Sequence, residues 1–365
     1  MEAAVRERLF ELLRAARILA DPSHALGREA RVRLTHSSGL SKENVEWALT
    51  SALETQPSEA ELELLAASVA KTPRSHVLLS ANVFVGAHRA IALALAASSE
   101  VCVRPSRREP EMTDLLAAAA PGLFQRVQEL HPLPGEQLFA YGRTETLREV
   151  ARALPSSVTL HGHGPGFGLI VVSAAARNGT PLEELARRIA VDIAAFDQRG
   201  CLSPRVLLVE GSHERALEIA REIALALSAR ERSVPLGKLT ALELAEIARY
   251  RDTMAYSGDL FSAGSGYVAV APPGASLELA PVGRNLHVFS VADARSLVRP
   301  LGAAITTFAY EGSPEGEAEL ARALPGARKA RPGEMQTPRF DGPVDLRSPR
   351  GVAPLRANTP EAGNR

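Results

Sequence analysis

Apolar and polar positions in the first 70 residues recur with a helical period. In residues 1–20, Val5, Leu9, Leu12 and Ala16 fall on one face, which predicts an amphipathic helix. The stretches LSKENVEWALTSAL and SEAELELLAASVA repeat this pattern. Each opens with a serine and has an acid near three residues later, the signature of a capping box. The N-terminal part is therefore predicted to be helical.

From about residue 76 the pattern changes to short apolar runs that alternate with helical stretches. Strands are predicted at HVLLSAN, EVCVRP, EQLFAYG and SVTLHGHG, with helices at VFVGAHRAIALALAAS, EMTDLLAAAA and TETLREVARAL. A second series starts at FGLIVVS and includes a helix at 181–195, the strand RVLLVE, helices at 212–229 and 239–255, and strands at 267–271, 286–291 and 303–309. Such alternation is typical of βαβ units with parallel sheets. The predicted fold class is α/β, with two Rossmann-like halves joined near GHGPGFG.

These patterns divide the chain into three parts, at 1–165, 166–325 and 326–365. The last part is rich in Pro, Gly and Arg and has little periodicity. Its end, RANTPEAGNR, has the composition of a disordered tail.

Composition excludes several classes of function. The 365 residues include 42 Lys and Arg and 42 Asp and Glu, so no net charge favours nucleic acid or a membrane surface as partner. Two cysteines cannot form a disulfide framework, which favours a reducing compartment. The N-terminus lacks an apolar signal core, and no long uncharged stretch reads as a membrane span. A cytoplasmic location is predicted.

The candidate chemistry begins with a cysteine in FDQRGCLSPRVLLVE. Cys201 stands at a Gly-Cys turn between Arg199 and Arg205, where cations and free backbone N–H groups favour a thiolate nucleophile. The alternative is a small buried hydrophobic residue, which is the commoner role of a free cysteine. Cys102, inside EVCVRP, is predicted to be a core residue.

Several segments together resemble the long-chain acyl-CoA reductases of bacterial luminescence, within the aldehyde dehydrogenase superfamily. DQRGCLSPRVLLVE is similar to the superfamily's active-site segment, and LSANVFVGAHRAIALALAASSEVCVRPSRREP to its Asn turn, long helix and cofactor-binding strand. AYGRTETLREVARAL resembles the next turn and helix, and SVTLHGHGPGFG the crossing to the catalytic part. RPGEMQTPRFDGPVDLRSP resembles a C-terminal signature that general aldehyde dehydrogenases lack. These segments occur in family order over roughly residues 75–350.

The resemblance implies reduction of a fatty acyl-CoA to an aldehyde through a thioester on Cys201. Asn82 aligns with the superfamily's oxyanion asparagine, and the backbone N–H of Cys201 would be the second donor. Such donors stabilise the tetrahedral intermediate of acyl transfer. The alternative for Asn82 is a helix N-cap, because it directly precedes VFVGAHRAIALAL.

The resemblance also implies a nicotinamide cofactor. GHGPGFG is not a dinucleotide fingerprint, because Phe167 stands where the third glycine is needed. The implied cofactor-binding residues are instead Arg104, Pro105, Ser106 and Arg107, followed by Gly142 and Thr144 in the next turn. Arginine at 107, where NAD-selective relatives often have an acid, suits a 2′-phosphate and favours NADPH, with NADH as the alternative.

One departure from the superfamily concerns the glutamate that activates water in hydrolytic relatives. The matching stretch, VTLHGHGPG, has His161 and His163 and no carboxylate, so reduction is favoured over hydrolysis. His163 either assists at the site by polarising it or moving a proton, or only satisfies a backbone group. No third metal ligand has suitable spacing, so no metal is expected.

The sequence thus predicts a cofactor-binding domain with N-terminal helices at 1–165, a catalytic domain at 166–325, and a C-terminal segment that returns to the body. We expect a dimer or tetramer, and a partner enzyme that supplies the acyl group or consumes the aldehyde. Two alternatives stay open. One is a reductase of an acyl phosphate or of an acyl carrier protein thioester. The other is a non-catalytic relative that binds acyl-CoA or a partner, which the short segment before Asn82 favours.

Overall fold

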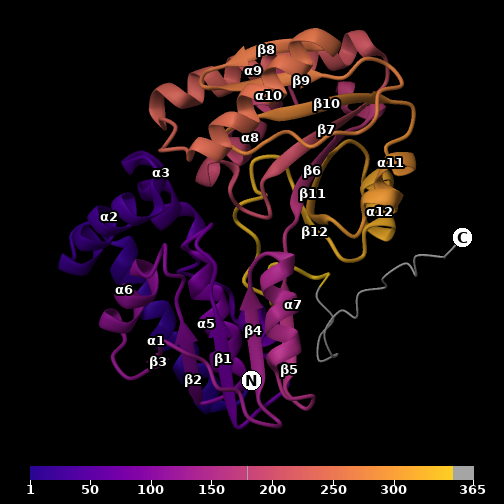
Figure 1. Ribbon diagram of the computed structural model, residues 1–365. Helices are drawn as coiled ribbons and strands as arrows, with labels where there is room; N and C mark the ends of the chain where they lie inside the picture. Colours follow the sequence, from indigo (N-terminus) through magenta and orange to yellow (C-terminus); the bar gives the residue numbers. More distant parts are fainter. Residues whose placement is uncertain (179, 348–365) are drawn as a thin grey trace, which may run out of the picture.

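The computed structural model describes residues 1–178 and 180–347. Their strands form two separate β-sheets (Figure 1). The first sheet has five parallel strands in the order β3-β2-β1-β4-β5. Their bounds are β1 Arg74–Leu78, β2 Glu100–Arg104, β3 Gln125–Arg126, β4 Gln137–Tyr141 and β5 Thr159–His163. This order reverses direction between β1 and β4, where ligands of open α/β sheets bind beyond the carboxyl ends of the strands.

Helices cover both faces of the first sheet. On one face, α5 (Gly86–Ala97) and α6 (Glu111–Ala119) share an apolar core with the N-terminal helices α1 (Ala3–Ala20), α2 (Ala25–Ser38), α3 (Lys42–Trp47) and α4 (Glu59–Ala67). A π-helical turn at Ala48–Ala52 continues α3. On the other face, α7 (Thr144–Ala153) packs on β4 and β5. The predicted α/β class is confirmed.

The N-terminal helices differ from the sequence prediction in two details. Helix α2 was not predicted, because its buried stripe is thin and contains only Gly27, Ala30 and Leu34. The expected capping box exists at Ser58, whose hydroxyl and Glu61 bond reciprocally. At Ser41 only the hydroxyl contributes, because the third residue after it is Asn44 and no acid returns the bond.

The second sheet has seven strands in the order β12-β11-β6-β7-β10-β9-β8. Their bounds are β6 Phe167–Val172, β7 Pro204–Glu210, β8 Asp259–Ala263, β9 Gly266–Val270, β10 Leu286–Val291, β11 Ile305–Glu311 and β12 Arg328–Ala330. Helices α8 (Leu182–Ala194) and α9 (His213–Ser233) share a core on one face, and α10 (Ala241–Ser257), α11 (Arg295–Leu301) and α12 (Pro314–Ala323) pack on the other.

This sheet is parallel as predicted except at one edge. There β8, which was not predicted, forms an antiparallel hairpin with β9. A short 3-10 segment, Ala174–Asn178, precedes α8, and a turn at Ala195–Gln198 with non-helical backbone angles follows it. The helices α11 and α12 and the strand β12 were likewise not predicted.

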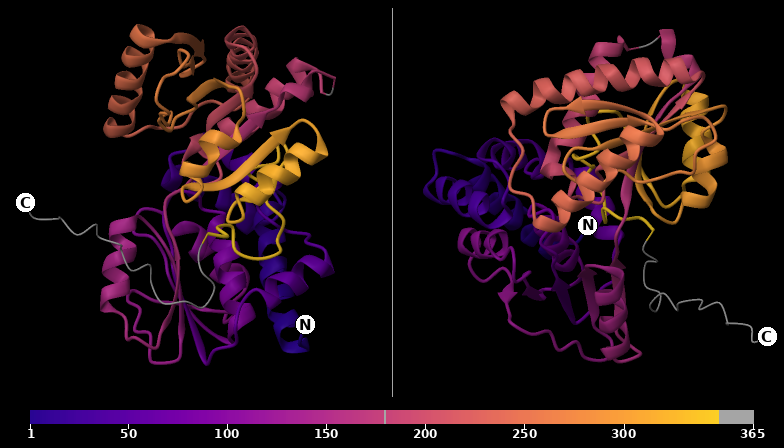
Figure 2. Two further views of the ribbon diagram at one scale, coloured as in Figure 1. Left: turned by 90° about the vertical axis from the view of Figure 1, so that its right-hand side faces the viewer. Right: turned by 45° about the horizontal axis from the view of Figure 1, so that its top comes forward.

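Residues 331–347, here called the C-terminal segment, leave β12 and run back to the first sheet (Figures 1 and 2). The buried Arg89 of α5 donates hydrogen bonds to the carbonyl oxygens of Pro338, Arg339 and Gly342, at 2.7, 2.7 and 2.9 Å. The predicted disordered tail lies outside the described residues. Within residues 1–178 and 180–347, no helix is both long and apolar enough to cross a membrane.

Candidate active site

Cys201 lies at the junction of the two sheets. The chain passes from the end of β5 at His163 to the start of β6 at Phe167, so the carboxyl edge of the first sheet adjoins the amino edge of the second. Cys201 stands three residues before β7, the neighbour of β6, at that same amino edge. The cysteine side chain is half-buried. It is therefore placed beside the sheet edge to which the predicted cofactor residues belong.

The turn that presents Cys201 is built on a strained backbone. Phe196, Asp197 and Gln198 have φ angles of 51°, 50° and 63°, a left-handed conformation that non-glycine residues rarely adopt. Each such residue costs on the order of 1–3 kcal/mol and persists only where its surroundings enforce it. Three in succession, separated from Gly200 and Cys201 only by Arg199, indicate a turn whose shape matters for function.

Buried polar side chains enforce this turn. The Asp197 carboxylate accepts hydrogen bonds from Nε and Nη2 of Arg284, at 3.1 and 2.8 Å, and from the side chain of Asn44 at 3.2 Å. Gln198 donates to the carbonyl of Asn285 at 2.6 Å and accepts from its N–H at 2.7 Å. Because Asn44 belongs to α3 and Arg284 precedes β10, both halves of the molecule hold the turn.

Asn82 approaches the same turn from the first sheet. Its neighbour Val83 places Cγ2 3.1 Å from the position that a Cβ on Gly200 would take, so the loop after β1 contacts the residue before Cys201. Asn82 is exposed, and its amide makes no hydrogen bond to another described residue. The alternative of an N-cap is wrong, because α5 begins at Gly86 and Val85 holds the cap position.

The C-terminal segment adds two charged groups near Cys201. Asp345 is buried and holds Arg347 through two 2.8 Å contacts, to Nε and Nη2. Arg347 also donates to the carbonyl oxygens of Ala303 and Pro165, at 3.0 and 3.1 Å. This pair therefore lies against residues 164–166, where the chain passes from the first sheet to the second, and close to Cys201.

The thiol of Cys201 is not activated in the way the sequence suggested. Arg199 turns to Glu243 at 3.1 Å, and Arg205 donates to the carbonyl of Ala280, so neither faces the sulfur. Burial raises the pKa of Cys201 to about 12, and Asp345 adds to this while Arg347 opposes it. The thiol is therefore protonated near neutral pH in this state.

The two histidines at the end of β5 differ in their surroundings. His161 bonds to Gln137 at 3.1 Å and stacks on Phe139, as a core residue does. His163 stacks on Tyr141 with a centroid distance of 4.5 Å, and neither ring nitrogen has a partner among the described residues. Burial lowers the pKa of His163 to about 4, so the ring is neutral near pH 7.

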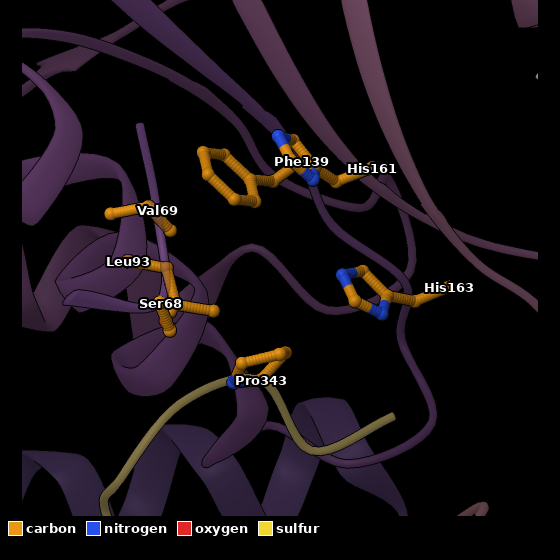
Figure 3. Close-up of a pocket in the computed structure, with 7 residues that line it drawn as sticks. All are labelled: Ser68, Val69, Leu93, Phe139, His161, His163 and Pro343. Atoms are coloured by element: carbon orange, nitrogen blue, oxygen red, sulfur yellow. The ribbon is translucent and has the colours of Figure 1, made fainter. Parts of the chain in front are cut away.

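Beside these rings lies a cavity of about 10 Å³, enough for roughly one water molecule. Figure 3 shows the ring of His163 pointing into it, with Pro343 of the C-terminal segment across from it. The suggestion that His163 only satisfies a backbone group finds no support, since its ring makes no such bond.

The predicted cofactor residues lie together at the carboxyl edge of the first sheet. Arg104 ends β2, and Pro105, Ser106 and Arg107 follow it. Gly142 follows β4, and Thr144 begins α7. Because β2, β1 and β4 are adjacent, the two groups flank the loop of Asn82. Cys102 lies half-buried within β2.

Sequence reasoning missed the residues that shape the site. Asp197, Gln198, Arg284 and Asn285 bond to one another across 87 positions, and Asp345 and Arg347 arrive from the far end of the chain. The only signal was the charged and amide character of FDQ and RN beside apolar strands. Their partners could not be assigned from spacing.

The two Rossmann-like sheets have the aldehyde dehydrogenase fold, as the similarity to solved structures shows. The chain is similar to an oxidoreductase from Marinobacter aquaeolei, with a TM-score of 0.69, 13% identity, and coverage of 95% of this chain and 84% of that one. It is similar to an NAD-dependent benzaldehyde dehydrogenase from Corynebacterium glutamicum, with a TM-score of 0.65, 15% identity, and coverage of 92% of this chain and 83% of that one. It is also similar to an NADP-dependent glyceraldehyde-3-phosphate dehydrogenase from Bacillus halodurans complexed with NADP. The TM-score is 0.64 and the identity 15%, with coverage of 92% of this chain and 79% of that one.

Comparison of the sequence with family models identifies a particular family. The acyl-CoA reductase (LuxC) family matches residues 135–347, which include the end of the first sheet, Cys201 and the C-terminal segment. The chain belongs to this family and is an oxidoreductase. A search of curated proteins finds no match.

Proposed function

We propose that this chain reduces an acyl-CoA to an aldehyde through an acyl thioester on Cys201. The overall reaction converts acyl-CoA, NADPH and a proton into aldehyde, coenzyme A and NADP⁺. The observation that favours it most is the contact between the loop of Asn82 and the strained turn of Cys201, beside the carboxyl edge of the first sheet. Family membership supports the same chemistry.

In the first step the sulfur of Cys201 bonds to the thioester carbon, and the carbonyl electrons move to oxygen. The Asn82 amide and the N–H of Cys201 stabilise that oxyanion, and coenzyme A then leaves with its sulfur. The raised pKa of the Cys201 thiol means that its proton must be removed for attack. His163, which is neutral and has no hydrogen-bond partner among the described residues, is proposed to assist by polarising the site or by moving a proton.

Reduction is favoured over hydrolysis for a physical reason. Asp345 is the carboxylate that influences the pKa of Cys201, and Arg347 engages both of its oxygens. A carboxylate held in this way is a poor base for water, because its oxygens already accept strong charge-assisted bonds. The acyl-enzyme is thus protected until hydride arrives.

The residues at the carboxyl edge suit a dinucleotide. Neither Arg104 nor Arg107 has a carboxylate partner among the described residues, and the N-terminus of α7 has no side-chain cap. Free cations and free helix N–H groups are the donors that phosphates require. We assign Arg104, Pro105, Ser106 and Arg107 to the adenosine side and Gly142 and Thr144 to the pyrophosphate or nicotinamide side. NADPH bound there would supply the hydride, and Arg107 favours it over NADH.

The test is acylation in the absence of cofactor. Incubation with a fatty acyl-CoA should add one acyl mass to the intact protein and release an equal amount of coenzyme A. The adduct should be absent in Cys201→Ser and retained in Cys102→Ser, the matched control. NADPH should then remove the adduct as aldehyde, more readily than NADH at equal concentration.

Other outcomes select the alternatives. Acylation by an acyl phosphate or by an acyl carrier protein, with acyl-CoA inert, would show a reductase of another activated acyl group. Tight binding of acyl-CoA with no adduct would show a non-catalytic binding protein.

Three further expectations stand as proposals. The cofactor-binding, catalytic and C-terminal parts correspond to 1–165, 166–325 and 326–365. The chain assembles as a dimer or tetramer, which the position of β8 at the sheet edge and the exposed Leu242, Leu244 and Tyr256 of α10 favour. A partner enzyme supplies the acyl group or consumes the aldehyde. Sedimentation at equilibrium measures the assembly directly.

A further inference from the structure

The side-chain amide of Gln336 is buried beside the Cys201 turn. Gln336 belongs to the C-terminal segment and is 6% exposed. Its Nε2 has no partner among the described residues. Its Oε1 lies 3.6 Å from the position that a Cβ on Gly200 would take. An unpaired buried amide costs about 1–3 kcal/mol, so its retention calls for a ligand that completes it.

Neighbouring bonds keep this amide where it is. Asp192 of α8 accepts hydrogen bonds from the N–H groups of Gly333 and Met335, at 2.6 and 2.9 Å. On the other side of Gln336, Arg89 holds the carbonyl of Pro338. Since α8 leads directly into the strained turn, Asp192 fixes Gln336 and Cys201 relative to each other.

The loop that carries Asn82 and the segment that carries Gln336 therefore both lie next to Gly200. Val83, next to Asn82, and Gln336 lie 3.1 and 3.6 Å from the same position above Gly200. They come from segments about 250 positions apart in the chain. What a bound substrate brings to this point is the carbonyl oxygen of an acyl group attached to Cys201, which is an acceptor and becomes an oxyanion.

We propose that Gln336 is a further catalytic residue, whose side-chain amide donates a hydrogen bond to the acyl oxygen together with Asn82. This deepens the proposed function and rests on it. As sulfur bonds to the carbonyl carbon and the electron pair moves to oxygen, Gln336 Nε2 stabilises the negative charge. When the pair returns and the bond to coenzyme A breaks, the same donor remains on the thioester oxygen.

The test uses Gln336→Met, which keeps the volume and removes the donor. The rate of coenzyme A release in the acylation half-reaction should fall about 100-fold, the usual effect of losing one oxyanion donor. The Kd for NADPH should not change. The melting temperature should be equal to or higher than that of the parent, because an unpaired buried amide has been removed. Thr337→Ala, the exposed neighbour on the same segment, is the matched control and should acylate at the parent rate.

Several results would overturn this assignment. Acylation at the parent rate in Gln336→Met would remove Gln336 from the reaction. A weakened NADPH affinity with normal acylation would place the amide on the cofactor instead. If Gln336→Met does not fold, Gln336→Leu, which also lacks a donor, is measured, and a normal acylation rate in it likewise contradicts the proposal. Failure of the parent protein to release coenzyme A would instead overturn the proposed function, so the two failures are distinguishable.

Discussion

At the scale of single residues, the state of the Cys201 sulfur depends on groups distant in sequence. Arg199 and Arg205, its neighbours along the chain, have other partners, whereas Asp345 and Arg347 set the local charge. Asp345 raises the pKa of the thiol because a second negative charge nearby is unfavourable, and Arg347 opposes this. Burial makes the largest contribution to the raised pKa of Cys201, and these two charged groups of the C-terminal segment modify it.

Replacing Asp345 should make the cysteine more reactive. In Asp345→Asn the repelling charge is gone and Arg347 is left unneutralised, so the pKa of Cys201 should fall from about 12. Alkylation by iodoacetamide at pH 8, followed by intact mass in a Cys102→Ser background, should be faster by about tenfold for each unit of that fall, because only the thiolate reacts.

In the parent the alkylation rate should keep rising, about tenfold per pH unit between pH 7 and 9, without a plateau. Asp341→Asn is the matched control, since that carboxylate pairs with Arg328 at 2.8 Å. A plateau below pH 9 in the parent, or no acceleration in Asp345→Asn, contradicts this account of the charge.

At the scale of elements, α5 and the C-terminal segment depend on one buried ion pair. Arg89 contacts Glu54 at 3.1 Å through Nε while it holds three carbonyl groups of the segment. Burial opposes the charge of Glu54, but Arg89 and His88 outweigh it and lower the pKa of Glu54 to about 2. A lowered pKa in the folded state stabilises the protein above the unfolded pKa of about 4.5, and this stability is lost as pH falls towards 2.

Replacing Arg89 should therefore destabilise the protein in a pH-dependent way. Arg89→Met removes the arginine partner of Glu54 and leaves only His88 beside its carboxylate, so the free energy of unfolding at pH 7 should fall by about 3–5 kcal/mol. The difference from the parent should shrink as pH falls from about 4.5 to 2, because Glu54 becomes neutral. Urea unfolding at pH 7 and at about pH 3 measures both values.

The control for this change is Arg339→Met, whose ion pair with Glu61 is largely on the surface and should matter by about 0–1 kcal/mol. A penalty for Arg89→Met that stays the same at both pH values would mean that the carbonyl contacts, rather than Glu54, dominate.

At the scale of the whole molecule, the C-terminal segment connects the two sheets. It leaves β12 of the second sheet, is pinned by Asp192 and Arg89, and ends with Arg347 over the crossing at Pro165 (Figures 1 and 2). The segment thus adds contacts between the two sheets to those that Asn44 and Val83 make with the cysteine turn.

Two truncations test that connection. A chain ended after Arg331 loses the partners of Asp192 and Arg89 together with the buried Met335, so acylation of Cys201 should be lost and thermal unfolding should begin at a lower temperature. A chain ended after Arg347 keeps every contact described above and should acylate at the parent rate. Equal acylation by the two truncated chains would show that the segment is dispensable.

The sequence determined the local elements and their class. Strands such as Gln137–Tyr141 and helices such as Thr144–Ala153 were predicted within one or two residues, because periodicity and turn residues act over short distances. Motif order also identified Cys201 and Asn82 as candidates. Hydrophobic periodicity did not predict α2, whose buried stripe is thin, or the hairpin strand β8, which lies at the edge of the sheet.

Only the tertiary structure decided how the cysteine turn is held and charged. The Asp197–Arg284 pair joins residues 87 positions apart, and Gln336, Asp345 and Arg347 reach the turn from the far end of the chain. Burial and electrostatic coupling depend on distances in space, whereas periodicity depends on spacing along the chain. The sequence could therefore identify Cys201 as the candidate nucleophile, whereas only the fold determined which groups surround its sulfur.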